Sequence, residues 1–116
     1  MKKSIIDTVR RQGPIPFERF MDLALYGVGG FFASSILRSQ KAGDFLTSPE
    51  VSPLFGETLA EFVRRERGRI GEPFTLVEVA GGSGSLLRPL LEIETVEAWA
   101  VEAAPAAREA LGAVVG

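Results

Sequence analysis

The chain has 116 residues, of which 46% are hydrophobic and 24% charged, and its formal net charge is -2. This balance is typical of a soluble globular domain and disfavours a nucleic-acid partner, whose phosphates attract strongly basic surfaces. The sequence contains neither cysteine nor histidine, so disulfides, thiolate nucleophiles, imidazole bases and the common zinc sites are excluded, and we expect no metal site. No apolar run approaches the roughly 18 residues of a membrane span, and no export signal is evident. We therefore expect a cytoplasmic protein with no membrane partner.

The first half of the chain is predicted to be helical, with irregular connections. Residues 3–12 carry apolar side chains at helical spacing, and the GPIP segment at 13–16 ends that helix because proline lacks an amide hydrogen. Residues 17–25 place apolar side chains at i, i+3, i+4, i+7 and i+8, which predicts a short amphipathic helix packed into the core. After an irregular stretch, Ser52 is the predicted N-cap of a further helix that begins at Pro53 and ends in an arginine-rich turn.

The second half alternates strand and helix patterns. TLVEVA at 75–80 is an unbroken β-type run of the kind that is buried on both faces in parallel sheets. A second strand is predicted at 98–102, and each strand is followed by a helical pattern. The resulting β-α-β-α order predicts the opening of a doubly wound, Rossmann-like α/β sheet. We divide the chain into a helical and loop segment, 1–73, and the start of the α/β domain, 74–116.

Three glycines within four residues separate the first predicted strand from its helix. The carboxyl ends of parallel strands are where open α/β sheets bind ligands, and Gly81, Gly82 and Gly84 would let a ligand lie against the main chain. Glu102 ends the next strand about twenty residues later, the spacing at which an acid can accept hydrogen bonds from ribose hydroxyls. These features predict a nucleoside site. The alternative is a glycine turn that serves tight packing only, with a solvated Glu102.

The spacing of the glycines argues against two common nucleotide sites. A dinucleotide fingerprint would need a third glycine where Leu87 stands, and the GK[ST] sequence of a P-loop is missing. The remaining pattern, Glu78-x-Ala80-x-Gly82-x-Gly84, is similar to the first motif of class I S-adenosylmethionine-dependent methyltransferases. An acid at Glu78 suits a sulfonium and ammonium ligand, because a positive charge needs a compensating charge nearby.

Longer stretches extend this resemblance over roughly residues 12–111. GPIPFERFMDLALYG, GDFLTSPEVSPLFGE, VEVAGGSGSLLRPLL and VEAAPAARE resemble the MidA-type methyltransferases, a bacterial and mitochondrial family associated in mitochondria with assembly of respiratory complex I. The resemblance implies a class I fold, S-adenosylmethionine as cofactor and methylation of an arginine nitrogen in a protein substrate. It also implies that the chain is the amino-terminal portion of a longer enzyme, mitochondrial if the source is eukaryotic, because two parallel strands need more covering structure.

The resemblance assigns roles to residues at matching positions. It implies a cofactor-binding set in the glycine turn, at the end of the second strand and in the family-specific loop: Glu78, Ala80, Gly81, Gly82, Gly84, Glu102, Thr47 and Ser48. Ala80 stands where the motif has a glycine, so its methyl group is expected to weaken binding. Because an arginine acceptor is protonated at ordinary pH, carboxylates that orient it are expected. The candidates for this catalytic role are Asp44, Glu50 and Glu57.

Two functions from other classes remain open. A non-catalytic interaction or assembly module would dock on a partner through the aromatic YGVGGFF segment and retain the glycine turn as a vestige. Ala80 and the short α/β portion favour this hypothesis, whereas the acids and glycines of the turn oppose it. A nicotinamide-dependent oxidoreductase is disfavoured by Leu87. Under the enzyme hypothesis the expected partner is a protein substrate, and a homo-oligomer of the chain stays open.

Overall fold

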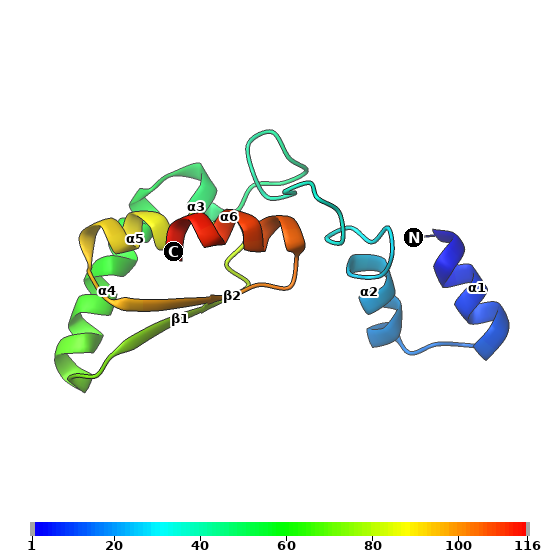
Figure 1. Cartoon of the computed structure of the whole chain (residues 1–116), viewed down its shortest axis with the longest axis horizontal. Helices are drawn as coiled ribbons and strands as arrows, with labels where there is room; N and C mark the ends of the chain where they lie inside the picture. Colours follow the sequence, from blue (N-terminus) through cyan, green and yellow to red (C-terminus); the bar gives the residue numbers. More distant parts are fainter. Residues whose placement is uncertain (1, 116) are drawn as a thin grey trace.

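The computed structural model describes residues 2–115 and has a mixed α/β fold (Figure 1). In chain order, its elements are α1 (Lys2–Gln12), α2 (Phe17–Leu25), α3 (Ser48–Val51), α4 (Leu54–Ile70), β1 (Thr75–Val79), α5 (Leu87–Ile93), β2 (Glu97–Val101) and α6 (Pro105–Val115). Helix α3 lies in the stretch that was predicted to be irregular. Helix α4 begins one residue later than predicted, and the Ser52 hydroxyl accepts the amide of Leu54 at 3.2 Å. None of the helices in these residues is long and apolar enough to cross a membrane.

The strands form a parallel pair that confirms the predicted β-α-β-α order. Strand β1 pairs with β2 from Thr75 opposite Glu97 to Val79 opposite Val101. Helices α5 and α6 lie on the same side of the pair in Figure 1. On that side Leu90 of α5 is buried in one cluster with Ala60 and Val63 of α4, and Leu76 of β1 packs against it. The core therefore joins α4, from the helical half, to the sheet.

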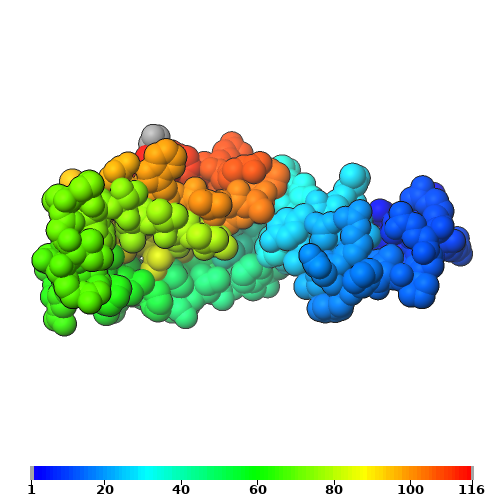
Figure 2. All heavy atoms as spheres, turned by 90° about the horizontal axis from the view of Figure 1, so that it is seen from below, coloured from blue at the N-terminus to red at the C-terminus, as the bar shows by residue number. Residues whose placement is uncertain are grey.

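The opposite face of the two strands is bare. Val77, Val79, Trp99 and Val101 are 55%, 73%, 62% and 55% exposed. Figure 2 shows both strands at the surface when the molecule is seen from below. The prediction that the first strand is buried on both faces is therefore wrong for this chain. Side chains alternate between the faces of a strand, and among residues 2–115 only the face that carries Leu76 has helices packed on it.

Helices α1 and α2 contact each other and lie apart from the sheet (Figure 1). The molecule measures 55 × 31 × 22 Å, and its radius of gyration is 17.7 Å, against about 13 Å for a compact domain of 100 residues. The prediction that the apolar stripe of α2 packs into the core is wrong. Phe17 and Phe20 are 73% and 40% exposed and stack on each other, because no sheet or helix other than α1 covers this stripe among the described residues.

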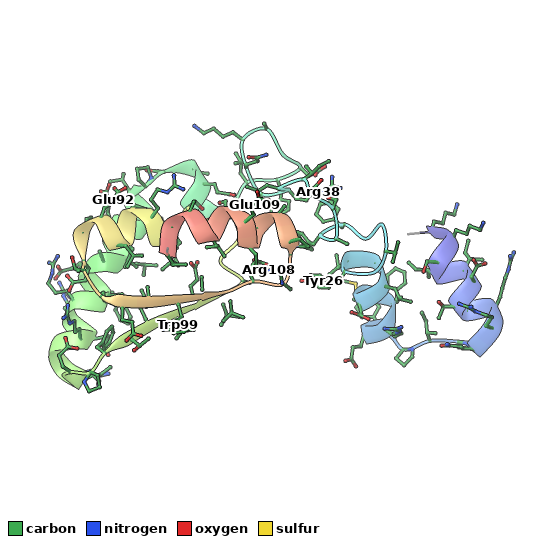
Figure 3. The ribbon with its side chains drawn as sticks, in the orientation of Figure 1. Tyr26, Arg38, Glu92, Trp99, Arg108 and Glu109 are labelled. Atoms are coloured by element: carbon green, nitrogen blue, oxygen red, sulfur yellow. The ribbon has the colours of Figure 1, made fainter. Side chains whose placement is uncertain are left out.

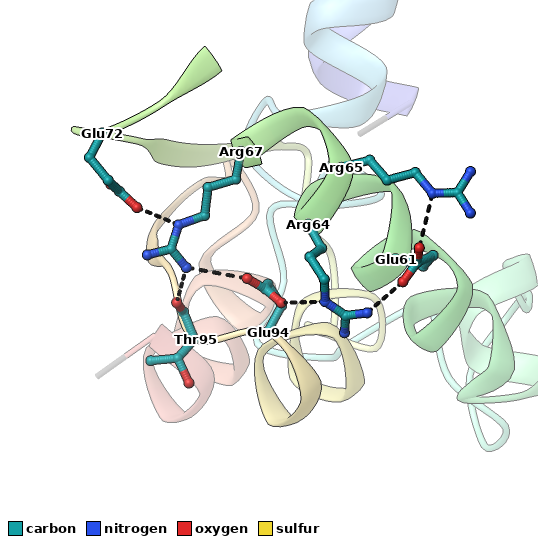
Figure 4. A network of polar contacts seen from close by, with 7 residues as sticks. All are labelled: Glu61, Arg64, Arg65, Arg67, Glu72, Glu94 and Thr95. Carbon is teal, nitrogen blue, oxygen red and sulfur yellow. Dashed lines mark hydrogen bonds and ion pairs between the residues drawn. The ribbon is translucent and has the colours of Figure 1, made fainter. Parts of the chain in front are cut away.

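The arginine-rich turn of α4 forms a network of ion pairs with the end of α5 (Figure 4). Arg64 and Arg67 each contact Glu94 at 3.2 Å, and Arg67 also donates to the carbonyl of Thr95 at 2.9 Å. The remaining pairs of the network lie at the surface, where each contributes about 0–1 kcal/mol. The network orients α4 beside the α5–β2 connection, and this arrangement holds both helices over the sheet.

Candidate functional site

The glycine turn leaves the carboxyl end of β1 with an unusual backbone. Ala80 has a positive φ of 61°, in the left-handed region that residues with a Cβ rarely adopt. Its amide donates to the carbonyl of Val101 at 2.7 Å, so the turn is tied to the end of β2. The motif has glycine at this position, and the geometry explains why: the backbone conformation favours a residue without a Cβ.

The glycines of the turn serve two different purposes. A Cβ on Gly84 would lie 2.8 Å from Cγ2 of Val114, and one on Gly81 would lie 3.1 Å from both Oε2 of Glu78 and a methyl of Leu111. These two glycines therefore allow α6 to approach the turn. Gly82 has a φ of 57°, and a Cβ there would meet nothing within 4 Å. Only this glycine of the turn borders open space.

Glu102 follows β2 directly and closes the turn from the neighbouring strand. One carboxylate oxygen, Oε2, accepts the amide of Gly82 at 3.0 Å, and Oε1 accepts the amide of Ala104 at 2.7 Å. Both oxygens keep acceptor capacity, because an ionised carboxylate has about four lone-pair sites. The geometry thus places a fixed carboxylate beside the one open glycine, as the spacing predicted.

Glu78 lies on the helix-covered face of β1, one residue pair before the strand ends. Its Oε2 is buried and has no hydrogen-bond partner among residues 2–115. Burial, reinforced by the negative charge of Glu102, raises the pKa of Glu78 to about 7. A buried oxygen without a partner is costly, and a cationic ligand group beside it would relieve that cost. This unpaired carboxyl is the strongest indication of a ligand at the turn.

A crevice separates the turn from the loop that connects α2 to α3. One cavity of about 270 Å³ is lined on the sheet side by small residues and Glu102, and on the loop side by aromatic and aliphatic residues with Arg38. A second cavity, of about 200 Å³, lies on the Glu78 side and shares four lining residues with the first: Ser39, Thr47, Ala80 and Gly82. The two cavities therefore form one continuous crevice, with an aromatic half walled by Tyr26, Phe32 and Phe45 and a second half that carries Glu78.

The loop is held over the turn by Glu50. Its Oε2 accepts hydrogen bonds from the amide (2.6 Å) and hydroxyl (2.9 Å) of Thr47, and its Oε1 accepts from Ser83 (3.0 Å) and from Ser39. Burial raises the pKa of Glu50, but hydrogen bonds from Ser39, Thr47 and Ser83 together lower it below the usual value. Glu50 thus connects the α2–α3 loop to the glycine turn and caps α3.

The predicted site residues are distributed unevenly around this crevice. Thr47, Ala80 and Gly82 line both halves of the crevice, Glu102 lines the aromatic half, and Glu78 and Gly81 line the other. Gly84 is buried under α6, and Ser48 is exposed at the start of α3.

None of the three predicted catalytic acids lines the crevice itself, although Glu50 bonds to residues that do. Asp44 forms an ion pair with Arg38 at 2.8 Å, and Glu57 is exposed on α4. The roles predicted for all these residues in binding or catalysis remain predictions.

Aromatic residues of the crevice were missed by the sequence reasoning. Tyr26, Phe32 and Phe45 line its loop side, and Phe31 joins them in a cluster with ring centroids 4.9–6.4 Å apart. Figure 3 shows Tyr26 beyond the end of α2, on the side that faces the β2–α6 connection. The signal was present in the YGVGGFF and GDF stretches, which lie near the two ends of the loop, but only the tertiary structure brings them opposite the glycine turn.

Known proteins similar to this chain support a single family. No protein-family model matches the chain. The mitochondrial protein arginine methyltransferase NDUFAF7 homolog of Drosophila melanogaster is 33% identical over 98 residues, which are 82% of this chain and 22% of that protein. The Homo sapiens protein arginine methyltransferase NDUFAF7 is 32% identical over 98 residues, with the same coverage.

A solved structure gives the same indication. A COG1565 superfamily member from Burkholderia thailandensis, bound to S-adenosyl-homocysteine, has a TM-score of 0.77 and 29% identity, and the match covers 97% of this chain and 33% of that one. The chain spans about a fifth of the length of the curated relatives it matches. The motif, the crevice and these similarities together show that the chain belongs to the MidA-type methyltransferase family.

Proposed function

We propose that the chain binds S-adenosylmethionine in the crevice between the glycine turn and the loop, as part of an enzyme that methylates an arginine nitrogen of a protein. The observation that carries the proposal is the unpaired, buried oxygen of Glu78, a residue that lines the same cavity as Gly82. The S-adenosyl-homocysteine bound to the Burkholderia neighbour and the names of the arginine methyltransferase relatives support the ligand and the acceptor.

The residues of the crevice fit the chemistry of this ligand. A sulfonium and an ammonium group carry positive charge, which the Glu78 carboxyl can neutralise and which would draw its raised pKa back down. Glu102 offers fixed acceptor oxygens to the ribose hydroxyls. The bare main chain at Gly82 allows the ligand to approach the backbone closely.

Bound S-adenosylmethionine supplies a methyl group that its sulfonium already activates for displacement. The protein must therefore align the acceptor nitrogen behind this methyl group and exclude water. We propose that Glu50 contributes by holding the loop against Ser83, which closes the crevice from one side. The proposal that Asp44 and Glu57 orient the substrate guanidinium requires Asp44 to exchange its partner Arg38 for the substrate.

Isothermal calorimetry with S-adenosyl-homocysteine and, separately, with NAD tests the proposal. We expect S-adenosyl-homocysteine to bind and NAD not to bind. Replacing Glu102 with alanine should weaken the affinity by about 1–3 kcal/mol, the range for loss of a charged hydrogen-bond partner, whereas Glu109→Ala, on the exposed side of α6, should leave it unchanged. Binding of NAD alone, or of neither ligand, would contradict the proposal.

A further inference from the structure

We infer that a further cavity, next to the crevice, binds a carboxylate side chain of the protein substrate through Lys41 and Arg88. The chain would then select an arginine that has an acidic residue nearby in its sequence. This inference rests on the proposed function and deepens it, since it names the class of substrate, an acidic peptide. It concerns the part of the substrate that lies outside the crevice and assigns no part of the cofactor.

The cavity has a volume of about 410 Å³ and adjoins the crevice. Its lining comes from the α2–α3 loop, the residues around the start of α4, the glycine turn and the start of α5, and includes Lys41, Ser52, Ser83, Ser85, Arg88 and Pro89. Ser83 and Ser85 also line the half of the crevice that carries Glu78. Under the proposed function, the cavity is therefore next to the place where the acceptor nitrogen meets the methyl donor.

Lys41 and Arg88 supply the positive charge of this cavity. Neither side chain has an ion-pair partner among residues 2–115. In this they differ from Arg38, Arg64 and Arg67, whose guanidinium groups are paired with carboxylates. Two cations in one cavity repel each other, and a carboxylate that joins them is attracted to both. The unpaired charges therefore favour an anionic group as the ligand.

Glu50 lines the same cavity but does not take this role. Its carboxylate already accepts hydrogen bonds from Ser39, Thr47 and Ser83. Burial raises the pKa of Glu50, but these bonds together lower it below the usual value, so the group is charged at neutral pH. Two cations and this one carboxylate give the cavity a formal charge of +1. One carboxylate balances that charge, a phosphate dianion would exceed it, and a guanidinium would increase it.

The side of the cavity formed by α4 and α5 is tightly packed. A Cβ on Gly56 of α4 would lie 2.5 Å from Cγ of Pro89, so this glycine allows the two helices to meet at the start of α5. The contact fixes the backbone of Arg88 beside the first turn of α4. Ser52, just before α4, accepts the amide of Leu54 at 3.2 Å and still has a hydroxyl proton to donate. A carboxylate would thus find a cation and a hydroxyl donor on packed elements.

The lining that the cavity shares with the crevice limits where the acid can lie in the substrate. Because Ser83 and Ser85 border both spaces, a chain whose arginine enters the crevice passes the cavity close by. An extended peptide advances only about 3.3–3.6 Å per residue. We therefore expect the acid within a few residues of the arginine in the sequence of the substrate.

Short labelled peptides test this preference. All carry a central arginine among glutamines, and one glutamate replaces a glutamine at successive positions on either side of the arginine. Fluorescence anisotropy gives their dissociation constants for the whole chain, with and without saturating S-adenosyl-homocysteine. We expect at least one glutamate peptide to bind about tenfold more tightly than the peptide without glutamate, the size expected for two partly exposed ion pairs.

Charge removal then assigns the preference to the cavity. Lys41→Gln and Arg88→Gln should each lower the preference for glutamate about threefold, and the double variant should abolish it. Arg88→Lys keeps the charge and should retain the preference. The matched controls Lys3→Gln and Arg10→Gln remove the same charge from exposed positions on α1 and should change nothing. Both cavity residues are exposed, so we expect every variant to fold, which circular dichroism checks.

The outcomes separate this inference from the proposed function. Equal affinities for all peptides, no peptide binding, or a preference that persists in the double variant would overturn the carboxylate site, even where S-adenosyl-homocysteine binds. A preference that requires Lys41 and Arg88 in a chain that does not bind S-adenosyl-homocysteine would support the site and contradict the proposed cofactor.

Two further results would also overturn the site. If Lys41→Gln or Arg88→Gln weakens the binding of S-adenosyl-homocysteine itself, the cations serve the cofactor and not the substrate. If phosphoserine at the preferred position binds more tightly than glutamate, the cavity takes a dianion and not a carboxylate. An unchanged affinity for S-adenosyl-homocysteine and a preference for glutamate over phosphoserine are the results that we expect.

Discussion

The buried carboxyl of Glu78 makes the stability of this chain depend on pH in an unusual direction. Burial raises its pKa to about 7 in the folded chain, against an ordinary value of 4.5. Below pH 4.5 the group is protonated in both the folded and the unfolded chain, so it costs nothing. Between these values the folded chain binds more protons than the unfolded one, and the free energy of unfolding therefore falls as the pH rises. Above pH 7 the full cost is present.

The size of this effect follows from the same two values. One pKa unit corresponds to about 1.36 kcal/mol, so the rise from 4.5 to about 7 sets an upper limit of about 3 kcal/mol. Glu78 is only half-buried, although its Oε2 is fully covered, and solvent screens part of the cost. We therefore expect a contribution of about 1–2 kcal/mol.

Urea unfolding of the wild-type chain and of Glu78→Gln, from pH 4.5 to pH 8, measures this contribution. Glutamine does not titrate, so the variant should gain about 1–2 kcal/mol relative to the wild type over this range. The cost of burying the glutamine amide does not change with pH, so it drops out when the pH dependence of the free energy of unfolding is compared between the two chains. Glu109→Gln, on the exposed side of α6, should run parallel to the wild type. Parallel curves for Glu78→Gln as well would refute the reasoning.

Three further predictions concern the turn and the loop. Ala80→Gly should raise the free energy of unfolding by about 1 kcal/mol. A left-handed backbone costs about 1–2 kcal/mol for a residue with a Cβ, and the greater conformational entropy of glycine in the unfolded chain offsets only part of the relief. An unchanged melting temperature would contradict this prediction. Gly84→Ala should lower the free energy of unfolding by about 1–3 kcal/mol, because φ is 77° and the new methyl would clash with α6. The control Gly112→Ala has open space at its Cβ and should not destabilise the chain in thermal unfolding. Glu50→Ala should lower the free energy of unfolding by about 1–2 kcal/mol, because the capping hydrogen bonds of α3 are lost. Because the pKa of Glu50 is lowered in the folded chain, the stability difference between the wild type and Glu50→Ala should disappear as the pH falls below 4.5 in urea titrations. A difference that does not change with pH would contradict this prediction.

Local patterns predicted the elements of this chain well, because their causes are local. Helix α2 has the bounds predicted from its apolar spacing, and the strands and their order follow from short apolar runs separated by glycine and proline. The position of Glu102 beside Gly82 was also predictable, since parallel strands joined by one helix bring their carboxyl ends together. Burial was predicted poorly, as the bare face of the strands and the exposed stripe of α2 show. Periodicity identifies an apolar face but not whether anything covers it.

The sequence by itself determined the family, the glycine turn and the acids at its two sides, because spacing along the chain sets which residues a turn brings to the end of a strand. Only the tertiary structure decided that Gly82 is the glycine of the turn that faces open space, that Oε2 of Glu78 is buried without a partner among residues 2–115, and that Asp44 is paired with Arg38. It also decided that the aromatic residues of the loop stand opposite the turn. These are contacts between segments distant in sequence, and they depend on how the loop folds back over the sheet, which no local pattern specifies.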